Sequence, residues 1–166
     1  MKIRILGPKG TYSDIALDKY LENKKMNFEK SCGIVPLYFM NNEPFVVLIK
    51  QNNGDIGFPK GHVEGNETEL ETAARECKEE VDLSPRIIDG FREEISYHMS
   101  EYDTYKTIVF FVGVVDDLSY RRQESEISDI LLVPFAEAMK TLTYDDTRRV
   151  LAKVKEFYEN NKIKFN

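Results

Sequence analysis

The feature that most restricts the possible folds of this sequence is a run of β-branched and aromatic residues at 107–112 (TIVFFV). Residues of these types favour extended backbone, so the run predicts a strand that continues to about residue 115. Shorter runs predict the other strands, which are 32–39 and 45–49, forming a hairpin with a turn at 41–44, then 86–98 and 130–133. We therefore expect the chain to fold around a β-sheet.

Helical patterns occupy three stretches between and after these strands. The first covers residues 68–81, the second begins at Phe135, and the third runs from about Asp145 to Glu159. The apolar residues of the third helix fall on one stripe, which consists of Val150, Leu151, Val154, Phe157 and Tyr158. Strands on both sides of a helix, followed by further helices, predict an α+β sandwich. A length of 166 residues with 42% hydrophobic side chains suits one domain with a full core.

The helix predicted at 68–81 has two chemically different edges. At about 100° per residue, one edge is apolar and the other gathers carboxylates. The apolar edge, expected to face the core, consists of Leu70, Ala74, Cys77 and Val81, and the acidic edge consists of Glu76, Glu79 and Glu80. Thr68 and Glu71 have the spacing of a capping box that would start the helix.

Like charges on one helical edge repel each other, so we expect a compensating partner for Glu76 and Glu80. Clustered carboxylate oxygens suit Mg²⁺ or Mn²⁺, and Mg²⁺ usually takes further ligands from substrate phosphates. The alternative is a solvated face on which Arg75 pairs with Glu71 and Glu79 and the glutamates simply favour helix. The residues of the helix alone leave both interpretations open.

The residues before and within this helix resemble the Nudix box. The identities that match its spacing are Gly61, Glu67, Arg75, Glu76, Glu79 and Glu80, with Cys77 and Leu83 in the apolar positions. The resemblance covers residues 31–160, is strongest at 56–83, and implies a Nudix-like α/β/α sandwich with a mixed central sheet. Asp82 departs from the pattern, because the family usually has glycine there, where a left-handed residue ends the last turn. We expect a small stability cost from Asp82 and no loss of chemistry.

The resemblance also implies roles for individual residues. The ligands of Mg²⁺ would be the carbonyl of Gly61 and the carboxylates of Glu76, Glu79 and Glu80. Arg75 would orient Glu76 or Glu79, and Glu67 would steady Arg75. Glu79 is the first candidate for the base that activates water for in-line attack on a phosphoanhydride. Glu126 is the candidate for a further carboxylate from a later loop, although an ordinary charged loop residue is the alternative.

A narrower resemblance concerns the substrate. The run 58–62 (FPKGH) is similar to a segment of asymmetrical diadenosine tetraphosphate hydrolases, which produce ATP and AMP. It implies that Lys60 and His62 lie beside the polyphosphate, and similar positions imply that Lys106 contacts the substrate and Tyr144 stacks on adenine. Alternatively, Lys60 is a solvated charge at a strand end and His62 an ordinary loop residue. The alternatives to Tyr144 as the stacking residue are Tyr97, Tyr102 and Tyr105.

Other functions remain open at this point. Other Nudix substrates would be nucleoside triphosphates, nucleotide sugars or ADP-ribose, diphosphoinositol phosphates, and the 5′ ends of RNA. A nucleotide-sensing module without turnover is an alternative of a different class, and the intact acidic and basic positions of the box argue against it. His98, at a predicted strand end, is expected to have a structural role.

The first 27 residues predict a strand–turn–helix appendage, which leaves the Nudix-like domain at 28–166. Residues 1–13 (MKIRILGPKGTYS) resemble the start of prephenate dehydratases, but too little of that domain is present to perform its reaction. Because such a fragment cannot bury its own apolar face, we consider it a gene-fusion remnant, a lid or an element for homodimer formation.

The charge balance limits the partners of this chain. With 23 Lys and Arg against 29 Asp and Glu, the net charge of −6 argues against nonspecific binding to nucleic acid or anionic membranes. The apolar runs are too short to span a bilayer, and the start lacks the apolar stretch of a secretion signal. We expect a cytoplasmic protein with a small-molecule nucleotide substrate, in which Cys32 and Cys77 are reduced and packed.

Overall fold

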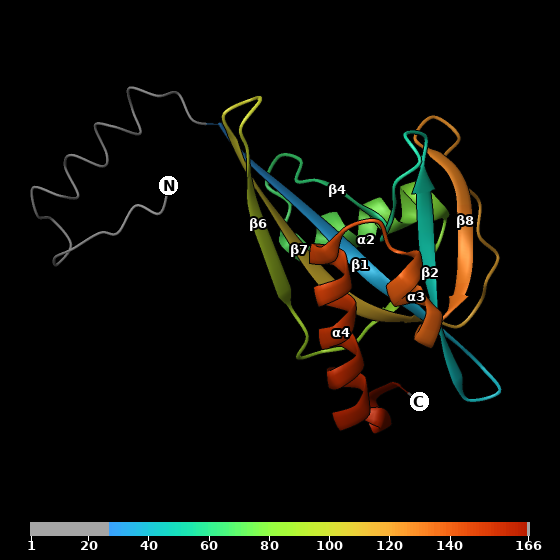
Figure 1. Ribbon diagram of the computed structural model, residues 1–166. Helices are drawn as coiled ribbons and strands as arrows, with labels where there is room; N and C mark the ends of the chain where they lie inside the picture. Colours follow the sequence, from blue (N-terminus) through green and yellow to red (C-terminus); the bar gives the residue numbers. More distant parts are fainter. Residues whose placement is uncertain (1–26, 166) are drawn as a thin grey trace, which may run out of the picture.

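The computed structural model describes residues 27–165 (Figure 1). The predicted appendage lies outside the described residues except for Asn27, which begins the first strand. The strands are β1 (Asn27–Met40), β2 (Glu43–Gln51), β3 (Ile56–Gly57), β4 (Lys60–His62), β5 (Arg86–Ile87), β6 (Glu93–Met99), β7 (Thr104–Val115) and β8 (Ile127–Pro134). The helices are α2 (Glu69–Val81), α3 (Phe135–Thr141), α4 (Asp145–Asn160) and the 3₁₀ turn η1 (Lys162–Phe165). None of the helices described is long and apolar enough to cross a membrane.

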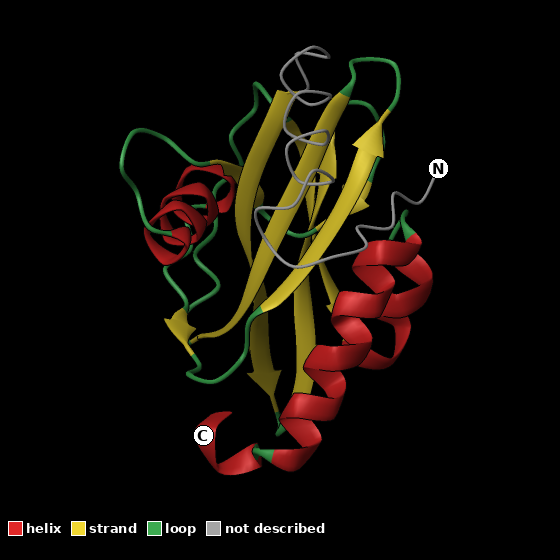
Figure 2. Cartoon of the chain, turned by 90° about the vertical axis from the view of Figure 1, so that its left-hand side faces the viewer, coloured by secondary structure: helices red, strands yellow, loops and turns green. Residues whose placement is uncertain are grey.

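The strands form one mixed sheet with the order β3-β2-β1-β7-β5, to which β4, β6 and β8 add by pairing with β1, β7 and β2. The long central pair, β1 and β7, is parallel, and the other pairs are antiparallel. Figure 2 shows α2 on one face of the sheet and the C-terminal helices on the other. The predicted α/β/α sandwich with a mixed sheet is therefore confirmed.

Each face of the sheet has its own hydrophobic core, and β1 contributes to both because successive side chains point to opposite faces. Val35 and Leu37 pack in the core beneath α3 and α4. Cys32 and Ile34 pack in the core beneath α2, together with Cys77. Both cysteines are buried and free, as expected.

Two of the predicted strand boundaries need correction. The hairpin turn contains only Asn41 and Asn42, because both adopt positive φ (53° and 65°) and allow Met40 to pair directly with Glu43. The single strand predicted at 86–98 is two strands, β5 and β6, separated by a loop in which Gly90 has a φ of 96°. The loop still buries Ile88 and Phe91, which explains why its pattern resembles a strand.

The helix α2 begins and ends as predicted, but the face that it buries is different. Thr68 and Glu71 form the capping box, and Asp82 ends the helix in the left-handed conformation with φ 58°. Leu70 is 41% exposed and Ala74 is also exposed, so half of the predicted apolar edge is wrong. The buried residues are Thr72, Ala73, Cys77, Glu80 and Val81. The helix is rotated so that Glu80, one carboxylate of the acidic edge, points inward. There it accepts a hydrogen bond from the backbone N–H of Lys60.

The predicted C-terminal helices are both present. Val150, Leu151 and Val154 of α4 are buried, while Phe157 and Tyr158 pack half-buried against the same core. The helices α3 and α4 do not cover the whole of their face of the sheet. They do not reach the end of the sheet that carries β4 and the start of β1 (Figure 1).

Candidate active site

A cleft of about 440 Å³ lies between β1, β4, α2 and the loop before β8. The predicted acidic residues that line it are Glu76, Glu79, Glu80 and Glu126, and the basic or imidazole residues are Lys60, His62, Arg75 and Lys106. Gly61 also lines it, so the structure brings together all predicted site residues except Glu67 and Tyr144. The cleft further includes Ser31, Gln51, Glu64 and Gln123, which the sequence pattern did not indicate.

Strand pairing places β4 directly against the acidic helix. In the register of β1 with β4, Ser31 is opposite His62 and Cys32 is opposite Gly61. Glu80 is only 2% exposed, and its Oε2 accepts a hydrogen bond of 2.8 Å from the backbone N–H of Lys60. Burial raises the pKa of Glu80 to about 8, and the hydrogen bond from Lys60 only partly offsets it. The alternative of a fully solvated glutamate face is therefore wrong.

Glu76 occupies the space that a side chain at position 61 would need. A Cβ built on Gly61 would lie 2.1 Å from the carboxyl carbon of Glu76, so only glycine permits this approach. Burial raises the pKa of Glu76, although Arg75 opposes the shift. Glu76, which is partly buried, and Glu80, which is buried, thus lie against β4 at Gly61 and Lys60.

Arg75 connects the acidic residues into one network. Its Nε and Nη2 donate to the two carboxylate oxygens of Glu67 at 2.7 and 3.0 Å. Its Nη1 donates to Glu76 at 2.8 Å and to Glu79 at 3.0 Å, and Nη2 also donates to the carbonyl of His62. Hydrogen bonds from Arg75, and then from Thr72, lower the pKa of Glu67 to about 2. Glu67 therefore lies behind Arg75, outside the cleft lining, in a position to fix the guanidinium.

The donor set fits a hard divalent cation in its chemistry. Glu76 and Glu80 carry raised pKa values, and Glu79, with a side chain that is 51% exposed, lies on the next turn. Carboxylate oxygens of this kind are preferred ligands of Mg²⁺ and Mn²⁺. Among residues 27–165, no three His, Cys, Asp or Glu side chains stand close enough to enclose an ion, and Glu76 and Glu79 are hydrogen-bonded to Arg75. Glu76, Glu79 and Glu80, together with the carbonyl of Gly61, are the groups that would hold such an ion.

The loop that precedes β8 is tied to both neighbours of the cleft. The backbone N–H of Gln123 donates to the carbonyl of Glu80 at 3.0 Å. The carbonyl of Glu126 accepts from the backbone N–H of Asn52 at 3.0 Å. These contacts hold the loop where Glu126 lines the cleft, and its role as a further carboxylate of the site stays a prediction.

The basic side of the cleft is held by a residue that the sequence pattern missed. Glu29 Oε2 lies 3.3 Å from Nε2 of His62 and 3.7 Å from Nζ of Lys106. Lys60 is partly buried and lines the cleft, and this burial lowers the pKa of its ammonium group. Glu29 lies beside Lys106 because of the register in which β1 and β7 pair in parallel. Local sequence patterns do not reveal this register, so they could not indicate Glu29.

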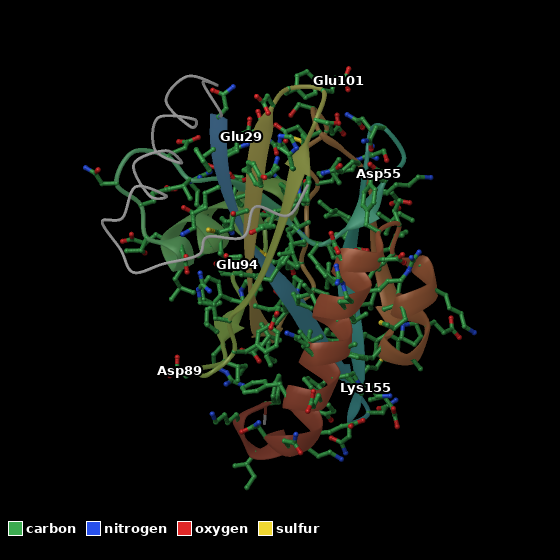
Figure 3. All side chains as sticks on the ribbon, turned by 60° about the vertical axis from the view of Figure 1, so that its left-hand side comes forward. Glu29, Asp55, Asp89, Glu94, Glu101 and Lys155 are labelled. Atoms are coloured by element: carbon green, nitrogen blue, oxygen red, sulfur yellow. The ribbon has the colours of Figure 1, made fainter. Side chains whose placement is uncertain are left out.

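Tyr144 lies at the margin of the cleft and does not line it. Its side chain is 55% exposed, and its hydroxyl donates to Asp55 at 2.7 Å. Asp55 is bonded through its carbonyl to Gln51, a residue of the cleft, and Figure 3 shows Asp55 and Glu29 at the same end of the sheet. The hydrogen bond to Asp55 is the main cause of the raised pKa of Tyr144, and the charge of Tyr97 contributes.

The remaining aromatic candidates have other contacts. The ring of Tyr105 stacks on Phe28 at 6.0 Å and packs against His98 at 4.7 Å. His98 Nε2 also lies 3.0 Å from Asp103, in keeping with a structural role. Tyr102 is 65% exposed. Among these alternatives, Tyr97 is the one that interacts electrostatically with Tyr144. It is therefore the next candidate for the stacking residue.

Comparisons with known proteins agree with this geometry. Residues 29–154 match the model of the NUDIX domain. The chain is 32% identical over 117 residues to the asymmetrical bis(5′-nucleosyl)-tetraphosphatase of Sus scrofa, covering 67% of this chain and 78% of that protein. It is 26% identical over 152 residues to an uncharacterized Nudix hydrolase, NudL, of Cronobacter sakazakii, covering 80% of this chain and 76% of the relative.

Solved structures show the same fold. An Ap4A hydrolase of C. elegans, in a binary complex, superposes with a TM-score of 0.73 at 20% identity, covering 80% of this chain and 98% of that one. The NUDIX domain of Shewanella oneidensis NrtR, complexed with ADP ribose, gives a TM-score of 0.65 at 17% identity, covering 84% of this chain and 96% of that one. The family model, which covers most of the described chain, decides the assignment: this protein belongs to the Nudix family of hydrolases.

Proposed function

We propose that this Nudix pyrophosphohydrolase cleaves dinucleoside tetraphosphates asymmetrically into a nucleoside triphosphate and a nucleoside monophosphate. The observation that carries the proposal is that one cleft holds the acidic cluster together with Lys60, His62 and Lys106. A row of cationic and hydrogen-bonding groups beside carboxylates suits a long phosphate chain. The identity of 32% to the asymmetrical tetraphosphatase of Sus scrofa supports the same substrate.

In this proposal the acidic side of the cleft performs the chemistry. Glu76, Glu79, Glu80 and the carbonyl of Gly61 would hold Mg²⁺ or Mn²⁺, and the ion neutralises charge that develops on the phosphate. Arg75 orients Glu76 and Glu79, and Glu67 fixes Arg75 in turn. Glu79 is the candidate base, because it is the most exposed of the three helical carboxylates and can reach a water molecule. Glu126 is the second candidate for this role.

The basic side and the rim would bind the rest of the substrate. Lys60 and Lys106 neutralise phosphate charge, and His62 donates a hydrogen bond to a phosphate oxygen. Tyr144 stacks on a base at the margin of the cleft, with Tyr97 nearby. No covalent intermediate with the protein is required, because water attacks phosphorus directly in this reaction class.

Product analysis tests the proposal directly. Purified protein with Mg²⁺ is incubated separately with diadenosine tetraphosphate, ATP, ADP-ribose and a diphosphoinositol phosphate, and the products are separated by anion-exchange chromatography. We expect equal amounts of ATP and AMP from the dinucleotide and little turnover of the others. Preferred turnover of another compound would retain the Nudix chemistry and refute the proposed substrate. Nucleotide binding without any turnover would favour a sensing module.

A further inference from the structure

Glu29 places a negative charge against two groups that the proposed function assigns to phosphate. One oxygen of its carboxylate, Oε2, faces both Nε2 of His62 at 3.3 Å and Nζ of Lys106 at 3.7 Å. The parallel pairing of β1 with β7 sets Glu29 next to Lys106, and Figure 3 shows it at the end of the sheet that carries the cleft. The carboxylate therefore contacts the same atoms that an incoming phosphate oxygen would contact.

The surroundings keep this carboxylate charged and available. The hydrogen bond with His62 is the largest cause of the lowered pKa of Glu29, and Lys106 adds to it, so Glu29 is an anion at neutral pH. The side chain of Lys106 is only 15% exposed, whereas that of Glu29 is 39% exposed. The carboxylate of Glu29 can therefore move into solvent more easily than the ammonium group of Lys106 can reach another partner. Its two contacts are partly exposed, which makes them weak enough to exchange.

We propose that Glu29 competes with phosphate for His62 and Lys106 and thereby sets the affinity of the cleft for polyphosphate chains. Substrate binding displaces the carboxylate from His62 and Lys106. This inference rests on the proposed role of the basic side of the cleft. It makes Glu29 a residue that limits binding and does not take part in the chemical step.

The test measures binding of inorganic tripolyphosphate in Mg²⁺-containing buffer by isothermal titration calorimetry. Glu29→Gln keeps the size and hydrogen-bonding oxygen of the side chain but removes its charge, so we expect the Kd to fall by about fivefold. Glu94→Gln is the matched control, because it removes the same charge from β6 but its carboxylate pairs with Arg92 at 2.9 Å. Figure 3 shows Glu94 farther along the sheet from Glu29. The control should change the Kd by less than about twofold.

Two further variants separate competition from a structural effect. Glu29→Asp retains the charge and should bind tripolyphosphate nearly as the unaltered protein does, with a similar Tm. Lys106→Gln removes the contested partner, so the gain from Glu29→Gln should shrink in the double variant. The inference is overturned if the folded Glu29→Gln protein binds no more tightly than the unaltered protein. It is also overturned if Glu94→Gln produces the same gain.

Kinetics then distinguish this inference from the choice of substrate. With diadenosine tetraphosphate, Glu29→Gln should lower KM by about the same factor as the Kd and leave kcat within about twofold, because only binding competition is removed. If tripolyphosphate binding responds as expected but the dinucleotide is not hydrolysed, the role of Glu29 stands and the proposed substrate fails. A large fall in kcat would instead assign Glu29 to the positioning of catalytic groups and contradict competition.

Discussion

At the scale of single residues, the tightest fit in the cleft is between Gly61 and Glu76. A methyl group at position 61 would overlap the carboxylate of Glu76, whose flexible end could move away without disturbing the backbone. We therefore expect Gly61→Ala to fold with a stability change under about 1 kcal/mol, as measured by urea unfolding. Displacing a catalytic group by about 1 Å can reduce the rate about 100-fold, and we expect a loss of this size in kcat.

A matched control for this substitution is Gly57→Ala, since apart from its chain neighbours no atom of the described residues lies within 4 Å of a Cβ built there. It should leave both stability and kcat nearly unchanged. If Gly61→Ala retains full activity, the approach of Glu76 to β4 has no catalytic importance.

Tyr144 allows a second test at this scale. If its ring stacks on a base, Tyr144→Leu removes about 1–3 kcal/mol of binding and should raise KM for diadenosine tetraphosphate by about tenfold. Tyr144→Phe keeps the ring and loses only the exposed hydrogen bond to Asp55, so its KM should stay within about threefold. Steady-state kinetics of the two variants provide the measurement. Equal KM values for the two variants would mean that another residue stacks on the base. Tyr97 would then be the next residue to substitute.

The sequence was informative about residues wherever a role depends on local spacing. The carboxylates of α2, Arg75 and Gly61 occur at fixed intervals, and the structure gathers all of them in one cleft. Glu29 was missed because its contacts depend on which strands pair and in which register, and β1 and β7 are more than 60 positions apart in the chain. Tyr144 does not line the cleft, because spacing alone does not determine how far a helix start lies from it, and its stacking role stays a prediction.

At the scale of elements, periodicity predicted which helices and strands exist better than it predicted their orientation. The rotation of α2 could not be derived from apolar residues alone, because a backbone donor at Lys60 attracts the carboxylate of Glu80 inward. The split between β5 and β6 was hidden because Ile88 and Phe91 remain buried across the loop. In both places tertiary contacts override the local pattern, and the first of them shapes the site.

An ion-pair cluster attaches the start of α2 to the sheet. It leads to a further prediction about stability. Glu69 accepts two hydrogen bonds from Arg92 and one from Lys30, and the bond from Arg92 is the main reason that its pKa falls to about 2. Arg92→Ala should therefore lower the free energy of unfolding by about 1 kcal/mol at pH 7. The pair stabilises the fold above the unfolded pKa near 4.5 and loses its effect as pH falls toward 2.

Urea unfolding at pH 6 and pH 3 checks both the size and the sign of this effect. The difference between Arg92→Ala and the unaltered protein should shrink by about half or more at the lower pH. Arg149→Ala is the control, because among residues 27–165 Arg149 pairs only with Asp146 within α4 and its side chain is 74% exposed. Its cost should be under about 0.5 kcal/mol. A cost for Arg92→Ala that is independent of pH would mean that lost packing, and not the ion pair, is responsible.

At the scale of the whole molecule, we expect the buried carboxyl group of Glu80 to couple the stability of the fold to metal binding. Its folded-state pKa of about 8 lies above the ordinary value of 4.5, so the fold favours the neutral acid. Without a cation, the contribution of Glu80 to stability is therefore most favourable below pH 4.5 and is lost as pH rises toward 8. A divalent ion that binds the ionised carboxylate removes this penalty, and its binding releases a proton between these pH values.

Thermal unfolding of the unaltered protein and of Glu80→Gln tests this coupling. In EDTA at pH 8, the neutral amide should raise Tm by a few degrees, whereas the two proteins should melt close together at pH 5, where Glu80 is protonated. Mg²⁺ at 100 times the Kd that the unaltered protein has at pH 8 adds about 2.7 kcal/mol there, and the same Mg²⁺ concentration is used at pH 5 and with Glu80→Gln. This gain should be larger at pH 8 than at pH 5 and should shrink in Glu80→Gln, together with a loss of hydrolysis of at least about 100-fold. Equal Mg²⁺-induced shifts in both proteins, or unchanged hydrolysis, would remove Glu80 from the set of metal ligands.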